Sequence, residues 1–274
     1  NPDADESAWR VPEPPYRQMC RPDPVMGCWR PVSADPEQGA AALVSQRAEP
    51  IGIVRELRPA AVRELRSGVW LFDFGECISG WCRICLNEPS GTAVTVRYNE
   101  ILGEDGTLYD KNLRAGRMSE CTRRQTDEYL CRGGGAEIFE PHFTYHGFRY
   151  AEVSGVSGPM TEDSAVACAI RSQLETAGNF DCSDSLLCRI YEMIQRTFWG
   201  NLIGILTDCC SRDERLGWMG DHEALSGTEP FFLSAPAFLG KVVRDLRIGQ
   251  LPNGSYTDFV PYPPSEKGPG FGLP

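Results

Sequence analysis

Residues 93–100 read "AVTVRYNE", and this stretch alternates between apolar and polar side chains as a half-buried β-strand does. Val94, Val96 and Tyr98 fall on one face of such a strand, and the residues between them are polar. Similar short stretches, bounded by Gly, Asn and Pro, recur from about residue 51 to 170. They read "GVWLFDFGE", "ISGWCRICLNEPSG", "EYLCRGGG" and "FTYHGFRYAEVSG". Repeated half-buried strands at these intervals predict an antiparallel β-sandwich.

The hydrophobic period changes after about residue 180. The stretch 182–201, "CSDSLLCRIYEMIQRTFWGN", predicts an amphipathic helix that Ser183 or Asp184 caps and that Gly200 ends. The predicted apolar stripe of this helix consists of Leu187, Ile190, Tyr191, Ile194 and Phe198.

A second amphipathic helix is predicted over residues 234–250, "SAPAFLGKVVRDLRIGQ". Ser234 is its predicted N-cap, and Pro236 lies in its first turn, where a missing N–H costs nothing. Its predicted stripe consists of Phe238, Leu239, Val242, Val243 and Leu246. Two helices cannot bury their own apolar stripes, so we expect this region to be the beginning of something larger.

The composition excludes several classes of partner. The chain has 27 basic and 38 acidic residues, a net charge of −11, and no long basic block, so we expect no nucleic-acid partner. It has no run of about 18 apolar residues and no signal-peptide pattern, so we expect a cytoplasmic protein without a membrane partner. The 12 cysteines are irregularly spaced, which favours free thiols in a reducing compartment.

Residues 207–221 read "TDCCSRDERLGWMGD" and are too charged for a core segment. A thiol or metal site is one interpretation, but only Cys82 and Cys85 have the spacing of a zinc knuckle, and a strand would place them on opposite faces. A thiol nucleophile needs a base, and the chain has three histidines. These are His142, His146 and His222.

Carboxylates offer the other interpretation of the same stretch. Acids, Arg212 and Trp218 concentrated in a glycine-containing loop suit a polyhydroxylated ligand, because carboxylates bind hydroxyl pairs and an indole packs on a sugar ring. The residues alone support a site for such a ligand and a structural network of salt bridges about equally.

The stretch 207–221 resembles the signature "DCPQRDERLGWTGD" of bacterial α-L-rhamnosidases of glycoside hydrolase family 78, and it departs from it at Cys210, Ser211 and Met219. Other segments resemble segments of this family in the same order, so that the resemblance covers roughly residues 50–265. They are 72–81, 93–117, 139–155, 180–194 and 251–264.

The resemblance implies a β-sandwich followed by an (α/α)6 barrel. We therefore expect residues 1–50 to be a connecting arm or the tail of a preceding domain, and 51–175 to be the β-sandwich domain. Residues 176–274 would form the N-terminal part of an incomplete (α/α)6 glycosidase domain.

The resemblance also implies the activity: hydrolysis of terminal α-L-rhamnosides with inversion, acting on a rhamnose-containing glycoside. Glu214 corresponds to the general acid. The residues that correspond to sugar-binding positions are Asp208, Arg212, Trp218 and Asp221. We expect no cofactor and no metal, and a homodimer stays an open expectation.

The family's catalytic base is a Glu far downstream of the acid, and no acid before residue 274 matches it by motif. The acids that remain are Glu223, Glu229, Asp258 and Glu266. We therefore expect a fragment that is inactive alone. The alternative is a non-catalytic carbohydrate-binding or structural β-sandwich module, which predicts exposed aromatic residues on one sheet face. The candidates for that face are Trp81, Tyr98, Tyr109 and Tyr145, although the core is the commoner place for such residues in strands.

Overall fold

The structure is a computed structural model that describes residues 10–12, 29–31, 44–113, 125–212 and 215–261. The chain divides into two compact units, Asn1–Ser45 and Gln46–Pro274. In the first unit, β1 (Arg10–Pro12) pairs with β2 (Trp29–Pro31) in antiparallel orientation. All other described elements belong to the second unit.

An antiparallel sheet of eight strands forms the larger part of the second unit. Six strands follow one another in the order β3-β10-β5-β9-β6-β7, and β4 and β8 both pair with β5. The strands are β3 (Ile51–Leu57), β4 (Ala61–Arg66), β5 (Val69–Leu86), β6 (Ala93–Asn99), β7 (Thr126–Leu130), β8 (Glu137–Phe139), β9 (His146–Ser154) and β10 (Ala165–Ser172).

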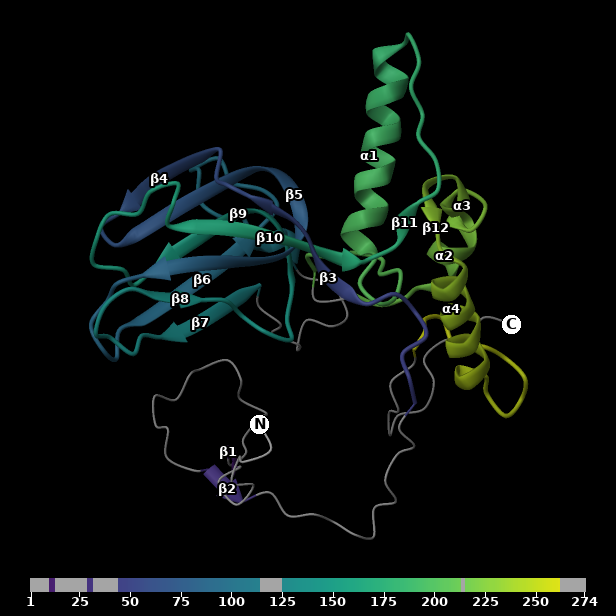
Figure 1. Ribbon diagram of the computed structural model, residues 1–274, viewed down its shortest axis with the longest axis horizontal. Helices are drawn as coiled ribbons and strands as arrows, with labels where there is room; N and C mark the ends of the chain where they lie inside the picture. Colours follow the sequence, from purple (N-terminus) through teal and green to yellow (C-terminus); the bar gives the residue numbers. More distant parts are fainter. Residues whose placement is uncertain (1–9, 13–28, 32–43, 114–124, 213–214, 262–274) are drawn as a thin grey trace. The chain divides into compact units, whose positions relative to one another are not determined.

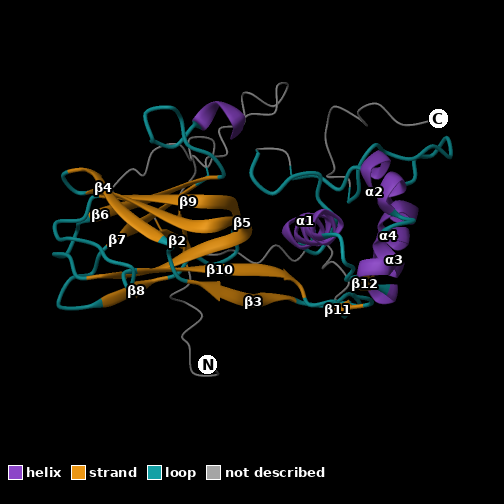
Figure 2. Ribbon diagram, turned by 90° about the horizontal axis from the view of Figure 1, so that it is seen from above, coloured by secondary structure: helices purple, strands orange, loops and turns teal. Residues whose placement is uncertain are grey.

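The 18 residues of β5 take part in both layers of the sheet. The first part of β5 pairs with β4 and β9, and its last part pairs with β10 and β8. Figure 2 shows β4, β6, β7 and β9 in one layer and β3, β8 and β10 in the other. The predicted antiparallel arrangement is confirmed, but the two layers belong to one curled, hydrogen-bonded sheet, because β5 continues from one layer to the other.

The core of the sheet contains the predicted face of "AVTVRYNE". Val94 and Val96 are fully buried, and Tyr98 is 1% exposed, so this prediction is confirmed. Phe148 of β9 packs on Tyr98, with ring centroids 4.8 Å apart, and edge-on against Phe74 of β5 at 5.8 Å. Burying such aromatic side chains is a main source of the stability of a domain of this size.

The helices are α1 (Ser185–Asn201), α2 (Met219–Leu225), α3 (Glu229–Phe232) and α4 (Pro236–Gly249). Asp184 caps α1 as predicted, since its carboxylate accepts hydrogen bonds from the N–H groups of Leu186 and Leu187. The prediction of Ser234 as the N-cap of α4 is wrong. Ser234 lies in strand β12 (Leu233–Ser234), which pairs with β11 (Glu175–Thr176), and Ala235 is therefore the N-cap.

Only part of each predicted apolar stripe is covered. In α1, Phe198 is buried and Tyr191 packs against the same core cluster, while the other three members of the stripe are exposed. The exposed members of the stripe are Leu187, Ile190 and Ile194. Figure 1 shows the reason, because α1 meets the sheet with its C-terminal end and extends away from it. In α4, Phe238 and Val242 are buried and Val243 is exposed. None of the described helices has both the length and the apolar content needed to span a lipid bilayer.

We predict that Gly155→Ala will destabilise the fold more than Gly91→Ala. Both glycines have φ near the left-handed region, +88° and +85°, but a Cβ at Gly155 would overlap the carbonyl oxygen of Ala93, whereas a Cβ at Gly91 would meet nothing within 4 Å. Backbone strain alone costs about 1–2 kcal/mol, and the steric overlap should add about 1–3 kcal/mol at Gly155. Urea denaturation of both variants checks this, and equal losses would contradict it.

Candidate active site

Residues 207–221, the signature segment, run from the end of α1 into the first turn of α2. The structure describes this segment except for residues 213 and 214. Glu214, the predicted general acid, therefore lies outside the described residues, and so does Asp213. The site can be built from the residues that flank them.

Asp208 holds the two sides of the signature segment together. Its backbone N–H donates to the carbonyl oxygen of Leu216 at 2.9 Å, and its side-chain Oδ1 accepts from the N–H of Leu216 at 2.8 Å. One residue thus closes the loop that carries Arg212. The predicted sugar-binding residue Asp208 has a structural role in addition to any contact with a ligand.

Trp218 is fixed against the segment that follows α4. The N–H of Val260 donates to the carbonyl of Gly217, and the N–H of Met219 donates to the carbonyl of Asp258. Residue 217 must be glycine at this crossing, because a Cβ there would overlap the carbonyl oxygen of Val260. The Trp218 indole packs edge-on against the ring of Phe259, with centroids 5.4 Å apart. These contacts fix the orientation of the Trp218 indole.

Asp221 lies in helix α2 and is not its N-cap. Helix α2 begins earlier, with Trp218 at the N-cap, so Asp221 lies within the first turn. It is exposed there, as is Arg212 in the loop. A carboxylate in the first turn still interacts favourably with the positive end of the helix dipole.

Arg215, which directly follows Glu214, binds the signature segment to the sheet. Its Nη1 donates to the carbonyl of Tyr145 at 2.6 Å and its Nη2 donates to Oε1 of Gln125 at 2.5 Å. The guanidinium also lies over the Tyr145 ring, 4.7 Å from its centroid. Arg215 has φ of +51°, which is uncommon for a residue with a side chain. Local backbone strain is thus combined with a strong anchor beside the predicted acid.

The anchor continues into the core of the sheet. Gln125 is buried and contacts Nδ1 of His146, whose Nε2 lies 2.9 Å from Oδ1 of Asp127. The hydroxyl of Tyr98 donates to the other oxygen of Asp127 at 2.8 Å. This buried row of polar groups links Arg215 to the core residue Tyr98, and it explains His146 as a structural residue.

Glu100 is a residue of the site that the sequence analysis missed. It follows β6 directly, and its Oε2 accepts a hydrogen bond from the hydroxyl of Ser211 at 2.9 Å. The Cys210 thiol lies 3.9 Å from the other oxygen of Glu100. The only available signal was that "AVTVRYNE" ends in an acid, within a segment that resembles the family.

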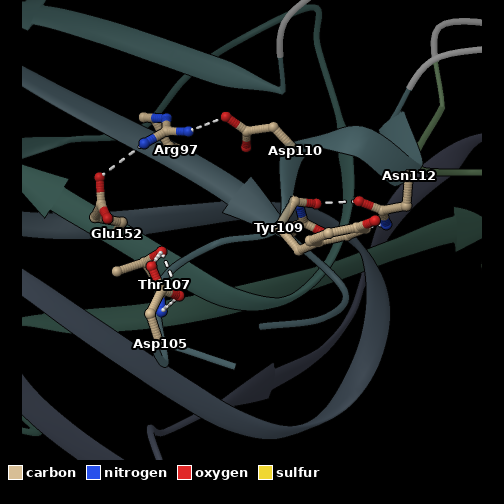
Figure 3. Close-up of polar contacts among 8 residues, drawn as sticks. Arg97, Asp105, Thr107, Tyr109, Asp110, Asn112 and Glu152 are labelled. Carbon is tan, nitrogen blue, oxygen red and sulfur yellow. Dashed lines mark hydrogen bonds and ion pairs between the residues drawn. The ribbon is translucent and has the colours of Figure 1, made fainter. Parts of the chain in front are cut away.

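The loop that begins at Glu100 is braced by polar contacts, which Figure 3 shows. Arg97 bridges Glu152 at 3.1 Å and also pairs with Asp110. The Asn99 side-chain amide donates to the carbonyl of Tyr109 at 2.6 Å. Glu100 is therefore presented to the signature segment from an ordered support.

The thiols of the signature segment are poor nucleophiles. Burial raises the pKa of Cys210 to about 12, and burial also raises the pKa of Cys209. The Nδ1 atom of His222 is buried without a hydrogen-bond partner in the described part of the chain, and burial lowers its pKa. Among the described residues, no group of three His, Cys, Asp or Glu side chains could hold a metal ion.

The four aromatic residues of the alternative module do not share one environment. Tyr98 is in the core, and Trp81 is partly buried and donates to Glu140 at 2.9 Å. Tyr145 lies under Arg215, and burial raises its pKa to about 12. Of these four residues, only Tyr109 is exposed.

Glu229 differs from the other acids in its surroundings. It lies in α3 and is completely buried, and neither carboxylate oxygen has a hydrogen-bond partner within the described residues. Burial raises the pKa of Glu229 above its ordinary value. This carboxyl group is therefore held in its neutral form more readily than an exposed Glu.

Comparison with known proteins gives two consecutive matches along the chain. Residues 63–171 match the bacterial alpha-L-rhamnosidase concanavalin-like domain. Residues 175–272 match the bacterial alpha-L-rhamnosidase 6 hairpin glycosidase domain.

Similar proteins include an alpha-L-rhamnosidase of Streptomyces avermitilis, which is 34% identical over 226 residues, or 82% of this chain and 21% of its own length. An alpha-L-rhamnosidase of Formosa agariphila is 30% identical over 214 residues, covering 78% of this chain and 22% of its own. Among solved structures, the alpha-L-rhamnosidase from Dictyoglumus thermophilum is 34% identical, with a TM-score of 0.77, and covers 85% of this chain and 26% of that one. The structure of the Streptomyces avermitilis enzyme complexed with L-rhamnose is 32% identical, with a TM-score of 0.78, and covers 86% of this chain and 22% of that one.

The curled sheet and the helices that follow it are therefore those of a glycosidase-like protein. The chain belongs to the bacterial α-L-rhamnosidase family. It spans between 21% and 26% of the length of each relative and solved structure described above.

We predict that Arg215 and Gln125 are energetically coupled. In a double-mutant cycle, Arg215→Ala and Gln125→Ala should show an interaction energy of about 0.5–3 kcal/mol. Either change alone breaks the hydrogen bond between the two side chains, so the second change cannot break it again. Chemical denaturation of the single and double variants measures this energy. The control cycle combines Gln125→Ala with Arg66→Ala, which changes an exposed position of β4. Its interaction energy should be close to zero.

We predict that Glu229→Gln will stabilise the protein increasingly as the pH rises above about 4.5, the ordinary pKa of Glu. Above that pH the unfolded chain loses the Glu229 proton while the folded protein retains it, so wild-type stability falls until the raised folded pKa is reached. Glutamine cannot ionise and avoids this loss.

Urea midpoints at pH 4.5 and pH 7 measure the effect of Glu229→Gln. Glu223→Gln, at an exposed position of α2, is the matched control, because it removes the same ionisable group from a side chain that is not buried. A stability difference between Glu229→Gln and wild type that stays constant with pH would contradict the prediction.

Proposed function

We propose that this chain is the part of an inverting α-L-rhamnosidase that supplies the general acid, Glu214, and part of the rhamnose-binding site. The observation that carries the proposal is the signature segment, which lies within a matched glycosidase domain. Hydrogen bonds join its two sides to each other and join it to the sheet. The sugar-binding residues in this proposal are Asp208, Arg212, Trp218 and Asp221. A solved relative complexed with L-rhamnose supports the choice of sugar.

In the proposed reaction, Glu214 donates its proton to the glycosidic oxygen as the bond to the leaving group breaks. A second carboxylate, about 6.5–9.5 Å from the first, takes a proton from the water that attacks the opposite face of the sugar. No motif in the 274 residues identifies that carboxylate, and we propose that another part of the complete enzyme supplies it.

The charges beside Glu214 support its role as an acid. Asp208, Asp213 and Asp221 lie near it in the sequence, and negative neighbours favour a protonated carboxyl group. Arg212 and Arg215 would oppose this effect. We propose that the carboxylates prevail and that the pKa of Glu214 is raised, as a general acid requires.

The same proposal extends to the architecture. Residues 51–175 would form the sheet domain and 176–274 the first part of an (α/α)6 barrel, following an arm at 1–50. The exposed apolar side chains of α1 and α4 support further helices packing there, since such side chains are normally covered in a helical domain.

We predict that Glu214→Gln in the complete enzyme will lower kcat for an unactivated α-L-rhamnoside by about 10²–10⁴-fold, the usual contribution of a general acid. A substrate with a dinitrophenol leaving group needs little protonation and should lose much less. The basic limb of the pH–rate profile should disappear in the variant.

Glu223→Gln serves as the control for Glu214→Gln, because it removes an exposed acid of α2 and should leave the kinetics unchanged. An unaltered pH–rate profile of Glu214→Gln would refute the assignment. Proton NMR of the first-released sugar tests inversion, since an inverting enzyme releases the β-anomer from an α-rhamnoside.

A further inference from the structure

A cavity of about 220 Å³ lies where the C-terminal end of α1 meets β3, β5 and β10. Arg55 of β3, Arg171 of β10 and Arg196 of α1 line it, together with Glu76 and Trp199. Figure 1 shows this end of α1 beside the ends of β3 and β10. The cavity is lined by residues other than those of the signature segment.

The charges of this cavity are not balanced. Among the described residues that line it, Glu76 is the one acidic side chain, and it bridges Arg55 at 2.9 Å and Arg196 at 3.3 Å. Within the described residues, Arg171 has no carboxylate partner. Three guanidinium groups and one carboxylate leave a local excess of positive charge in a chain whose net charge is −11.

The same cavity also holds hydrogen-bond donors that have no acceptor among the described residues. The Nε and Nη1 atoms of Arg171 and the Nε1 atom of Trp199 are buried without a hydrogen-bond partner in the described part of the chain. The Arg171 guanidinium lies over the Trp199 ring, 4.3 Å from its centroid, which fixes its position without using its donors. Buried donors of folded proteins are normally paired, so an unpaired set indicates a missing acceptor.

The burial of the Arg171 cation is unfavourable by itself. Burial lowers the pKa of the Arg171 guanidinium from its ordinary value, and the nearby charge of Arg55 lowers it further. An anion beside Arg171 would offset both effects, because it supplies an opposite charge and accepts hydrogen bonds.

We propose that this cavity is a binding site for a small oxyanion, either inorganic phosphate or a carboxylate, held by Arg171 and Arg196. Planar guanidinium groups match the oxygen geometry of both anions and bind them through paired hydrogen bonds. The volume corresponds to several water molecules at about 30 Å³ each, which is enough for such an anion and its hydration.

Other ligand classes fit the lining less well. A metal cation would be repelled by three guanidinium groups, and the only carboxylate in the lining is already bonded to Arg55 and Arg196. A neutral sugar would accept hydrogen bonds but would leave the excess charge uncompensated. Bound at this place, an oxyanion would join α1 to the sheet, where the Ser79 hydroxyl already donates to the carbonyl of Gly200.

Titration with inorganic phosphate at constant ionic strength tests the proposal, with binding followed by calorimetry and by the arginine Nε–H signals in NMR spectra. We expect saturable binding to the wild-type chain and a rise in its melting temperature. Arg171→Gln should weaken binding about tenfold or more, as expected for the loss of a charged hydrogen-bond donor. Acetate in place of phosphate distinguishes the two anions, and saturable binding of either supports the site.

Two further variants keep the test decisive. Arg196→Gln changes a half-exposed side chain, so it should fold normally and still weaken binding severalfold. Arg66→Gln removes one positive charge from an exposed position of β4, outside the cavity, and should bind as wild type does. The proposal is overturned if neither anion saturates, if Arg171→Gln and Arg196→Gln bind as tightly as wild type, or if Arg66→Gln loses as much affinity as they do.

Discussion

The continuity of β5 is the constraint on which the rest of the second unit depends. Its 18 residues pair with β4 and β9 in one layer and with β10 and β8 in the other, so one strand holds both layers in register. The β10 strand that pairs with it leads through β11 to α1, and the β9 strand carries Gly147 and His146 to the signature segment. The position of the candidate site therefore follows from how one strand bends, since both of its supports are attached to β5.

The polar row from Tyr98 to Arg215 shows how a sheet can hold a loop that has little regular structure of its own. A neutral hydrogen bond contributes only about 1 kcal/mol, but a buried row is disrupted as a whole when one member is lost. In this protein the row begins in the core and ends beside the predicted acid. The sheet domain is thus part of the support of the site, and a role limited to packing or separate carbohydrate binding is not needed to account for it.

Local features of the fold could be predicted from the sequence, and long-range ones could not. The burial of Val94, Val96 and Tyr98 follows from a period of two within one strand, and the Asp184 cap depends on residues three positions away or fewer. Glu100 was missed because its partner Ser211 lies 111 positions further along the chain. Ser234 was misassigned for the same reason, since its pairing with Glu175 is invisible to a local pattern. The signature segment indicated the acid and sugar-binding positions by resemblance. The anchoring of Arg215 to Tyr145 and Gln125 could not be predicted, because these partners lie 70 and 90 positions away along the chain.

The close approach of Gly147 to Cys210 limits how this site can be altered. A Cβ at Gly147 would overlap the Cys210 sulfur and lie against the backbone of Ser211, so the sheet surface and the signature segment fit together with no space for a larger pair. The signature segment cannot then be transplanted alone into another protein. A chimaera built from two such enzymes would need its crossover placed before β9, so that the strand and the loop shaped to fit it are inherited together.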